Sequence, residues 1–184
     1  GIKYADLDGN GIINEKDQTW IFNPVPAFSY GLNIDITFKG FDLAMFWQGV
    51  AGVDVYNNQK FQTDFWSITD AGSNKGSRLL GAWTTANTSS TIPALTTNNT
   101  ADEGRTSSYY VENGSYLKLR TLQLGYNLPA SLLKKLLMSK ARVYVSGQNL
   151  LTIKSSGLTC SDPENPNWNY PLPTSVSFGL QIGF

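Results

Sequence analysis

Apolar and polar residues alternate without interruption in the last ten residues of the chain, SVSFGLQIGF (175–184). Successive side chains of a β-strand project to opposite faces, so this pattern predicts a strand with one apolar face and one small, polar face. The apolar positions are Val176, Phe178, Leu180, Ile182 and Phe184. We therefore expect a half-buried strand that closes the chain on an aromatic residue.

A second alternating segment, residues 27–50, predicts a β-hairpin. Two alternating arms flank Lys39 and Gly40, which fit a two-residue hairpin turn. With that turn, the apolar residues of the two arms face each other on one side, and a slip of one residue would destroy the agreement. The expected pairs are Phe38 with Phe41, Ile36 with Leu43, Ile34 with Met45, and Leu32 with Trp47.

Two further strands are expected, at residues 116–127 and 141–153. Alternation in the first of them changes phase between Leu119 and Leu122, which predicts a β-bulge or an end that has left the apolar band. The connection between the strands, residues 128–140, predicts a turn with a short helix opened by Pro129. Its apolar side is expected to hold Leu132, Leu133, Leu136 and Leu137.

The connections between these strands are of two kinds. Two are short, the turn at Lys39 and Gly40 and the segment 128–140, whereas residues 51–115 and 154–173 form long polar loops. Short turns at one end and long loops at the other are typical of outer-membrane barrels, and a soluble β-sandwich has no reason to show them. We therefore predict an all-β fold, an antiparallel transmembrane β-barrel segment with five strands, long extracellular loops and one short periplasmic helix.

The long loop 51–115 carries few structural signals. Residues 55–66 predict a short helix, and the aromatic residues of the loop either line a ligand site or, as is more common, pin the loop to the body of the protein. These aromatic residues are Trp66, Trp83, Tyr109 and Tyr110.

The segment DLDGNGIINEKD, residues 6–17, matches the spacing of a twelve-residue Ca²⁺ loop. Hard oxygen ligands recur at every second position, and Gly11 stands at the sixth, where the loop turns sharply. The last position holds Asp17 in place of the usual Glu, which shortens the reach of the closing carboxylate. The candidate ligands are Asp6, Asp8, Asn10, Ile12 through its carbonyl, Asn14 and Asp17. The alternative is a turn rich in Asp, Asn and Gly that binds no metal.

Composition excludes several classes of protein. The chain has no histidine, which removes His-based triads and most zinc sites, and Cys160 is its single cysteine, so no internal disulfide forms. Fourteen basic residues balance fourteen acidic ones without the basic patch of a nucleic-acid-binding protein. Carboxylate pairs for a glycosidase exist, but they lie in polar loops, so we do not expect an enzyme. These pairs are Asp102 with Glu103, and Asp162 with Glu164.

Several blocks together resemble the C-terminal segment of a SusC/RagA-like TonB-dependent outer-membrane transporter. They are DLDGNGIIN, NPVPAFSYGLNIDITFKGFDLAMFWQGVAG, VENGSYLKLRTLQLGYNLP, RVYVSGQNLLT and the closing strand 174–184 that ends in Phe184. The blocks occur in the family's order, and only the outer loops are unmatched. The resemblance implies the last five strands of a 22-stranded barrel in the outer membrane. Counting the strands back from a C-terminus on the periplasmic side places residues 1–26, which include the calcium-type motif, outside the cell.

The same resemblance implies the partners and the function. They are a plug domain and the remaining strands of the same transporter, a SusD-like surface lipoprotein, TonB acting through an N-terminal region, and outer-membrane lipid. The expected function is import of glycans or peptides. The alternative from the residues alone is a secreted calcium-binding β-sandwich that binds carbohydrate or peptide.

Overall fold

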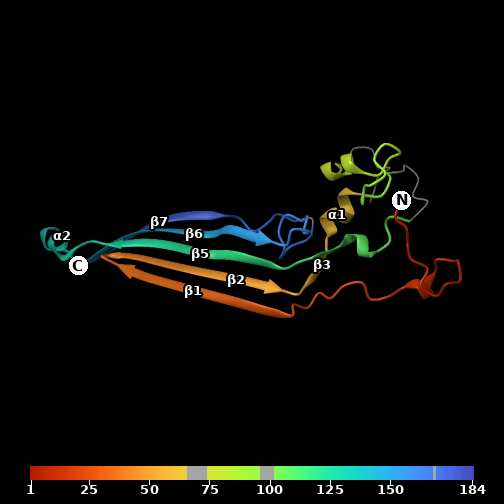
Figure 1. The fold of residues 1–184 in the computed structure, drawn as a ribbon. Helices are drawn as coiled ribbons and strands as arrows, with labels where there is room; N and C mark the ends of the chain where they lie inside the picture. The colour runs from red at the N-terminus through yellow and green to blue at the C-terminus, as the bar shows by residue number, and fades with distance from the viewer. Residues whose placement is uncertain (66–73, 96–101, 168) are drawn as a thin grey trace. The chain divides into compact units, whose positions relative to one another are not determined.

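The computed structural model describes residues 1–65, 74–95, 102–167 and 169–184. The chain forms two compact units. One contains residues 1–24, 54–112 and 159–169, and the other contains residues 25–53, 113–158 and 170–184. Each unit is described here by itself, with the elements labelled as in Figure 1.

The second unit is a single antiparallel sheet of five long strands in the order β1-β2-β5-β6-β7. Every strand expected from the alternating segments is present, which confirms an all-β architecture with few helices (Figure 1). The strands are β1 (Phe28–Phe38), β2 (Phe41–Ala51), β5 (Tyr116–Asn127), β6 (Lys140–Lys154) and β7 (Ser175–Gly183). The described residues add only a two-stranded sheet, so they do not supply the second large sheet of a β-sandwich.

The β1–β2 hairpin has the register that the apolar pattern predicts. Phe38 pairs with Phe41, and the other three expected pairs follow in step along the arms. Lys39 and Gly40 both have positive φ, 47° and 89°, as a two-residue turn that matches the twist of its strands requires. The hairpin prediction is therefore confirmed in both its turn and its pairing.

A bulge in β5 explains the change of phase in its sequence. Leu119 pairs with Trp47 and Thr121 with Phe46, so Arg120 is passed over. The register shifts again between β5 and β6 at the same place. Because one residue is skipped, Leu119 and Leu122 lie on the same face although their spacing is odd. Of the two explanations left open by the sequence, the bulge is confirmed.

One face of this sheet is apolar across all five strands, because paired residues share a face. Many of these side chains are exposed in the described chain, Phe178 by 84% and Phe38 by 65%. The face contains Leu32, Ile34, Ile36, Phe38, Leu43, Met45, Trp47, Leu117, Leu119, Leu122, Leu124, Val143, Val145, Leu151, Ile153, Val176, Phe178, Leu180 and Ile182. An exposed apolar surface of this extent marks an interaction with lipid or protein.

The opposite face is polar and is crossed by a charged contact. The guanidinium group of Arg142 on β6 donates to the carboxylate of Asp42 on β2, with an Nε–Oδ1 distance of 2.9 Å. Strand β5 lies between the two, and Gly125 on β5 leaves the room, because a Cβ there would come within 2.6 Å of both side chains. On the same face the ring of Tyr144 covers Gly179 of β7.

The helix in the connection from β5 to β6 is shorter than its leucine pattern indicates. Helix α2 (Ala130–Lys135) ends at Leu136, and Leu137 has a φ of 55°. The amide of Met138 donates to the carbonyl of Leu133, which closes the left-handed helix end. The expectation that Leu136 and Leu137 lie on the helix is therefore wrong. Both are exposed after its last turn.

The first unit is built from short elements. They are η1 (Glu15–Asp17), β3 (Asp54–Tyr56), α1 (Asn58–Thr63), η2 (Ser77–Gly81), η3 (Ser108–Tyr110) and β4 (Val111–Asn113), whose last residue is counted with the other unit. The helix expected within residues 55–66 is thus confirmed as α1, capped by Asn57, whose side chain accepts from the amide of Lys60. Among the described residues, no helix is both long and apolar enough to cross a bilayer.

Candidate functional site

The acidic loop at residues 6–17 brings three of its carboxylates together. One oxygen each from Asp6, Asp8 and Asp17 lies within 4.8 Å of the other two. The shorter side chain at the last position of the motif therefore reaches the other carboxylates. No lysine or arginine in the described part of the chain forms an ion pair with this group, so no basic side chain among these residues directly balances the three negative charges.

Asp17 closes the loop through its backbone contacts. Its two carboxylate oxygens accept from the amides of Leu7 at 2.8 Å and Asn14 at 2.7 Å. The Asn14 side chain in turn accepts from the amide of Lys16, and the two bonds form a capping box around η1. These backbone hydrogen bonds lower the pKa of Asp17 below its usual value. The carboxylate is therefore ionised at neutral pH, as a cation ligand must be.

The other three candidate ligands are engaged within the loop itself. Asn10 accepts from the amide of Ile12 at 2.7 Å, and the Asn14 side-chain amide donates to the carbonyl of Ile12 at 3.1 Å. Asp6 likewise accepts from three amides of the turn, among them Gly11 at 2.7 Å. The donor set consists wholly of hard oxygen atoms, which suits Ca²⁺. The same bonds also satisfy a metal-free turn, so the geometry fits both readings of the motif.

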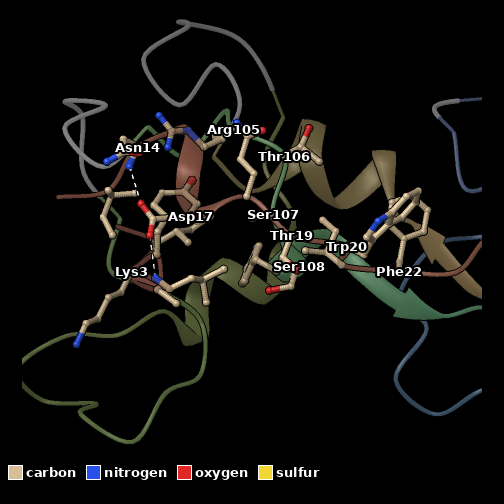
Figure 2. A pocket seen from close by; sticks show the side chains of 18 of the residues that line it. Lys3, Asn14, Asp17, Thr19, Trp20, Phe22, Arg105, Thr106, Ser107 and Ser108 are labelled. Atoms are coloured by element: carbon tan, nitrogen blue, oxygen red, sulfur yellow. Dashed lines mark hydrogen bonds between the residues drawn. The ribbon is translucent and has the colours of Figure 1, made fainter. Parts of the chain in front are cut away.

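A cavity of about 1190 Å³ lies beside the acidic loop, within the same unit. Asn14 and Asp17 form part of its wall, together with the segment 18–22 and the turn 105–109 (Figure 2). Its apolar lining comprises Ile2, Leu7, Ile13, Trp20, Ile21, Phe22, Pro24 and Pro93. Trp20 lies at the cavity with 95% of its surface exposed. A concave, mostly apolar surface with a few polar groups is the usual form of a ligand site.

A buried polar network anchors the turn that carries this wall. The hydroxyl of Tyr109 donates to Asp64 at 2.7 Å, and Arg78 forms an ion pair with the same carboxylate at 2.8 Å. Asp64 is fully buried. The ammonium group of Lys60 lies 4.0 Å from the centre of the Tyr109 ring. The Asp64 carboxylate at the end of α1 therefore holds η2 and η3 to that helix.

Glu112 joins two further segments to this network. It accepts from the side-chain amide of Asn57 and from both the amide and the hydroxyl of Thr159, each at 2.8 Å. The ammonium group of Lys60 lies 3.5 Å from Oε1 of Glu112, the oxygen that also accepts from the Thr159 hydroxyl. The loop that begins at residue 159 is thereby fixed to β4 and to the start of α1.

Burial sets the protonation states in the network. Burial and then the bond to Asp64 raise the pKa of Tyr109, so its hydroxyl remains a donor at neutral pH. Burial also lowers the pKa of Lys60, although the nearby Glu112 charge opposes that shift. For Glu112, burial acts to raise the pKa, but the bonds from Thr159 and Asn57 outweigh it and the pKa is lowered.

The aromatic residues of the long loop occupy different positions in the structure. Tyr110 is fully buried and packs edge-on against Phe61, so it pins the loop. Tyr109 both lines the cavity and joins the network, whereas Trp83 is exposed by 40% and is not among the cavity residues. Trp66 lies outside the described residues.

The carboxylate pairs considered for a glycosidase do not line the large cavity. Glu103 and Asp162 are both buried. The residues that sequence reasoning missed are the cavity wall 18–22 and the pair Asp64 with Arg78. The sequence did contain a signal for that wall, namely the aromatic residues Trp20 and Phe22. Aromatic residues in an otherwise polar loop often mark a surface that binds a ligand or packs against other parts of the protein.

No family model matches the chain. Over its full length of 184 residues it is 38% identical to TonB-dependent receptor P3 of Formosa agariphila, of which it covers 17%. It is 29% identical over 199 aligned residues to TonB-dependent receptor P26 of the same organism, covering 20% of that protein. The chain thus spans about a fifth or less of the length of these curated relatives.

A solved structure described as the RagAB peptide transporter is similar in fold. The match has a TM-score of 0.73 and 28% sequence identity, and covers 94% of this chain and 19% of that one. The resemblance to SusC/RagA-like TonB-dependent receptors drawn from the sequence blocks is therefore confirmed along the whole chain.

Proposed function

We propose that this chain, which matches a segment of TonB-dependent receptors over its whole length, forms five adjoining strands of an outer-membrane β-barrel in a nutrient importer. The relatives are receptors and a transporter rather than enzymes, so the chain supplies barrel wall and outer loops and performs no covalent chemistry.

The two unlike faces of the five-stranded sheet are the observation that carries this proposal. Apolar side chains such as Phe178 and Leu180 stand on one face of β7, and Ser177 and Gln181 stand on the other. A membrane barrel needs this arrangement, because its outer face contacts lipid and its inner face contacts water. Strands β1 and β7 each have one free edge in the sheet, and in lipid those edges must pair with further strands of the same barrel.

The connection lengths suggest which side of the membrane each end faces. We place the turn at Lys39 and the connection with α2 in the periplasm, and residues 1–26, 51–115 and 154–173 outside the cell. The partners in this proposal are a plug domain, a SusD-like lipoprotein and TonB, which drives import. The match to a structure described as RagAB supports a two-component assembly.

The same comparison supports a proposal for the substrate class. The solved neighbour is described as a peptide transporter, which favours peptides over glycans for this receptor, and import of a glycan is the competing outcome. Uptake of labelled peptide and labelled oligosaccharide by the intact receptor, each measured with and without TonB, separates the two.

Labelling of single cysteines tests the topology of the proposed barrel. Lys39→Cys and Glu15→Cys are each made in the full-length receptor after replacement of its native cysteines, including Cys160. A membrane-impermeant maleimide added to intact cells should label Glu15→Cys. It should label Lys39→Cys only after the outer membrane is permeabilised. Equal labelling of both in intact cells would contradict the proposal.

We also propose that the acidic loop binds Ca²⁺. Asp6, Asp8 and Asp17 would supply the carboxylates, and the ion would balance three charges that otherwise repel one another. Asn10, Asn14 and the carbonyl of Ile12 would complete the set. Outside the cell Ca²⁺ is abundant enough to fill a site of modest affinity. The role of the ion would be to fix the loop.

A further inference from the structure

Four consecutive residues in the cavity wall, Thr19–Phe22, leave their backbone groups unpaired. Within the described part of the chain, neither their four amides (N–H) nor their four carbonyls form a hydrogen bond. Gln18, the residue before the segment, has an extended backbone with a φ of −84° and a ψ of 135°. Residues 19–22 themselves contain no helix, turn or strand. A run of unpaired donors and acceptors is a template for pairing with another chain.

All four residues of this segment line the cavity of about 1190 Å³. The cavity wall also includes Ile2, Ile13 and the turn 105–109, from which Figure 2 shows Ser107 and Ser108. The segment thus combines main-chain hydrogen-bonding groups with apolar side chains and space for a ligand beside them. A protein that binds an extended peptide by strand addition uses these two features together.

Ser107 provides an independent indication that the cavity wall lacks a partner. It is 8% exposed, and its hydroxyl oxygen is buried without a hydrogen-bond partner among the described residues. Most buried polar side-chain atoms in folded proteins are satisfied, so an orphaned hydroxyl at a cavity calls for an explanation. Rotation of the Ser107 side chain toward a ligand that brings amide and carbonyl groups to this wall would supply the missing bond.

We propose that Thr19–Phe22 and the turn 105–109, which line the same cavity, form a groove that binds an extended peptide with apolar side chains. The inference rests on the proposed function, because it assigns a peptide subsite to the importer. The peptide backbone pairs with Thr19–Phe22, and its alternate side chains enter the apolar lining near Ile21 and Ile13.

A peptide fits this groove better than an oligosaccharide does. A sugar is rich in hydroxyl groups, and burying these against Ile2, Ile13 and Ile21 would leave them without partners. The main-chain groups of alternate residues in Thr19–Phe22 instead match the hydrogen-bonding repeat of an extended peptide. The cavity is also bounded by both acidic Asp17 and basic Arg105, so it is not dominated by one sign of charge.

The test uses the full-length receptor and a synthetic hexapeptide, N-acetyl-Leu-Ser-Leu-Ser-Leu-Ser-amide. Two versions carry N-methyl groups on alternate amides, one on the Leu amides and the other on the Ser amides. In an added strand only alternate amides face the partner edge, so one version should bind about tenfold more weakly or worse, and the other should change about threefold at most. Equal loss for both versions would overturn the proposal.

Hydrogen exchange on the unmodified receptor gives a second readout that needs no variant. Saturating peptide should slow exchange at the amides of residues 19–22, and maltohexaose should not. Protection of these amides before any peptide is added would mean that another part of the receptor covers the groove, and it would overturn the inference.

An uptake assay separates failure of this inference from failure of the proposed function. If the receptor imports the hexapeptide while exchange at residues 19–22 is unchanged, the importer proposal stands and the groove assignment fails. If wild-type receptor fails both to reach the outer membrane and to import any ligand, the proposed function itself fails.

Discussion

Arg142 and Asp42 form an ion pair that spans the strand lying between their own two strands. Asp42 lies on β2 and Arg142 on β6, and their contact passes over Gly125 of β5. Asn127 on β5 donates to the same carboxylate at 3.1 Å. The absence of a side chain at Gly125 thus allows one polar cluster to join three neighbouring strands near their turn end.

A methyl group at Gly125 should separate this pair. Gly125→Ala places a carbon within 2.6 Å of atoms in both side chains, and the guanidinium must move away because the carboxylate is held by Asn127. We expect a loss of about 1 kcal/mol in the stability of the assembled barrel, measured as a lower midpoint of guanidinium unfolding. In a receptor that already carries Arg142→Ala, the same change should have little effect, and an equal loss in both backgrounds would show that the pair is not involved.

Chelation of Ca²⁺ should loosen residues 6–17 and leave the barrel unchanged. We expect faster amide exchange at Leu7 and Asn14, whose bonds to Asp17 hold the loop, because removal of the ion leaves three carboxylates to repel one another. Asp6→Asn should mimic chelation. Glu15→Gln, an acidic neighbour outside the carboxylate group, serves as the control. Identical exchange with calcium and with chelator would contradict the metal site.

Loss of Arg78 should destabilise the first unit more than loss of an exposed arginine. Arg78→Ala leaves the fully buried carboxylate of Asp64 without its ion pair. Breaking a fully buried pair typically costs about 3–5 kcal/mol, and the partial exposure of Arg78 makes a smaller value the expectation. Exchange at the amide of Asp64, which closes the last turn of α1, measures the effect.

Arg105→Ala is the matched control for this change. Its ion pair with Asp102 is exposed on both sides, and such pairs contribute about 0–1 kcal/mol. Adding Asp64→Asn to Arg78→Ala should recover part of the lost stability, since the uncompensated charge is then removed. If the two single arginine variants behave alike, the buried network does not hold the unit together.

Acidification should open the same network through Glu112. Its pKa in the folded chain lies below the usual 4.5, so its stabilising contribution is complete above that value and is lost as the pH falls through the folded pKa. Exchange at the amide of Thr159, which donates to Glu112, should accelerate below about pH 4.5 after correction for the intrinsic rate. Glu112→Gln should remove this acceleration, and a persistent pH effect in that variant would point to another group.

The strands were predictable because apolar and polar residues alternate along each of them. Four apolar pairs fixed the register around Lys39 and Gly40, and the phase change between Leu119 and Leu122 indicated the bulge that the structure contains. The end of α2 was not predictable, since the leucines continue past it and Leu137 takes a left-handed conformation that usually favours glycine.

The candidate sites were only partly predictable, for a related reason. The acidic loop is local, so its spacing indicated which carboxylates converge. The cavity wall at Thr19–Phe22 and the bond from Tyr109 to Asp64 depend on segments about 45 to 90 residues apart, and no local pattern records such contacts. Strands β3 and β4 were missed because three residues are too few to show a period.

The central claim is that the apolar face of the sheet contacts lipid, and a pair of adjacent substitutions on β7 tests it most directly. Phe178 lies on the apolar face and Ser177 on the polar face, in the middle of the same strand. We predict that Phe178→Lys impairs folding of the full-length receptor into lipid vesicles by about 2–4 kcal/mol, whereas Ser177→Lys has a much smaller effect. Equal effects of the two substitutions, or a larger effect at Ser177, would contradict the account.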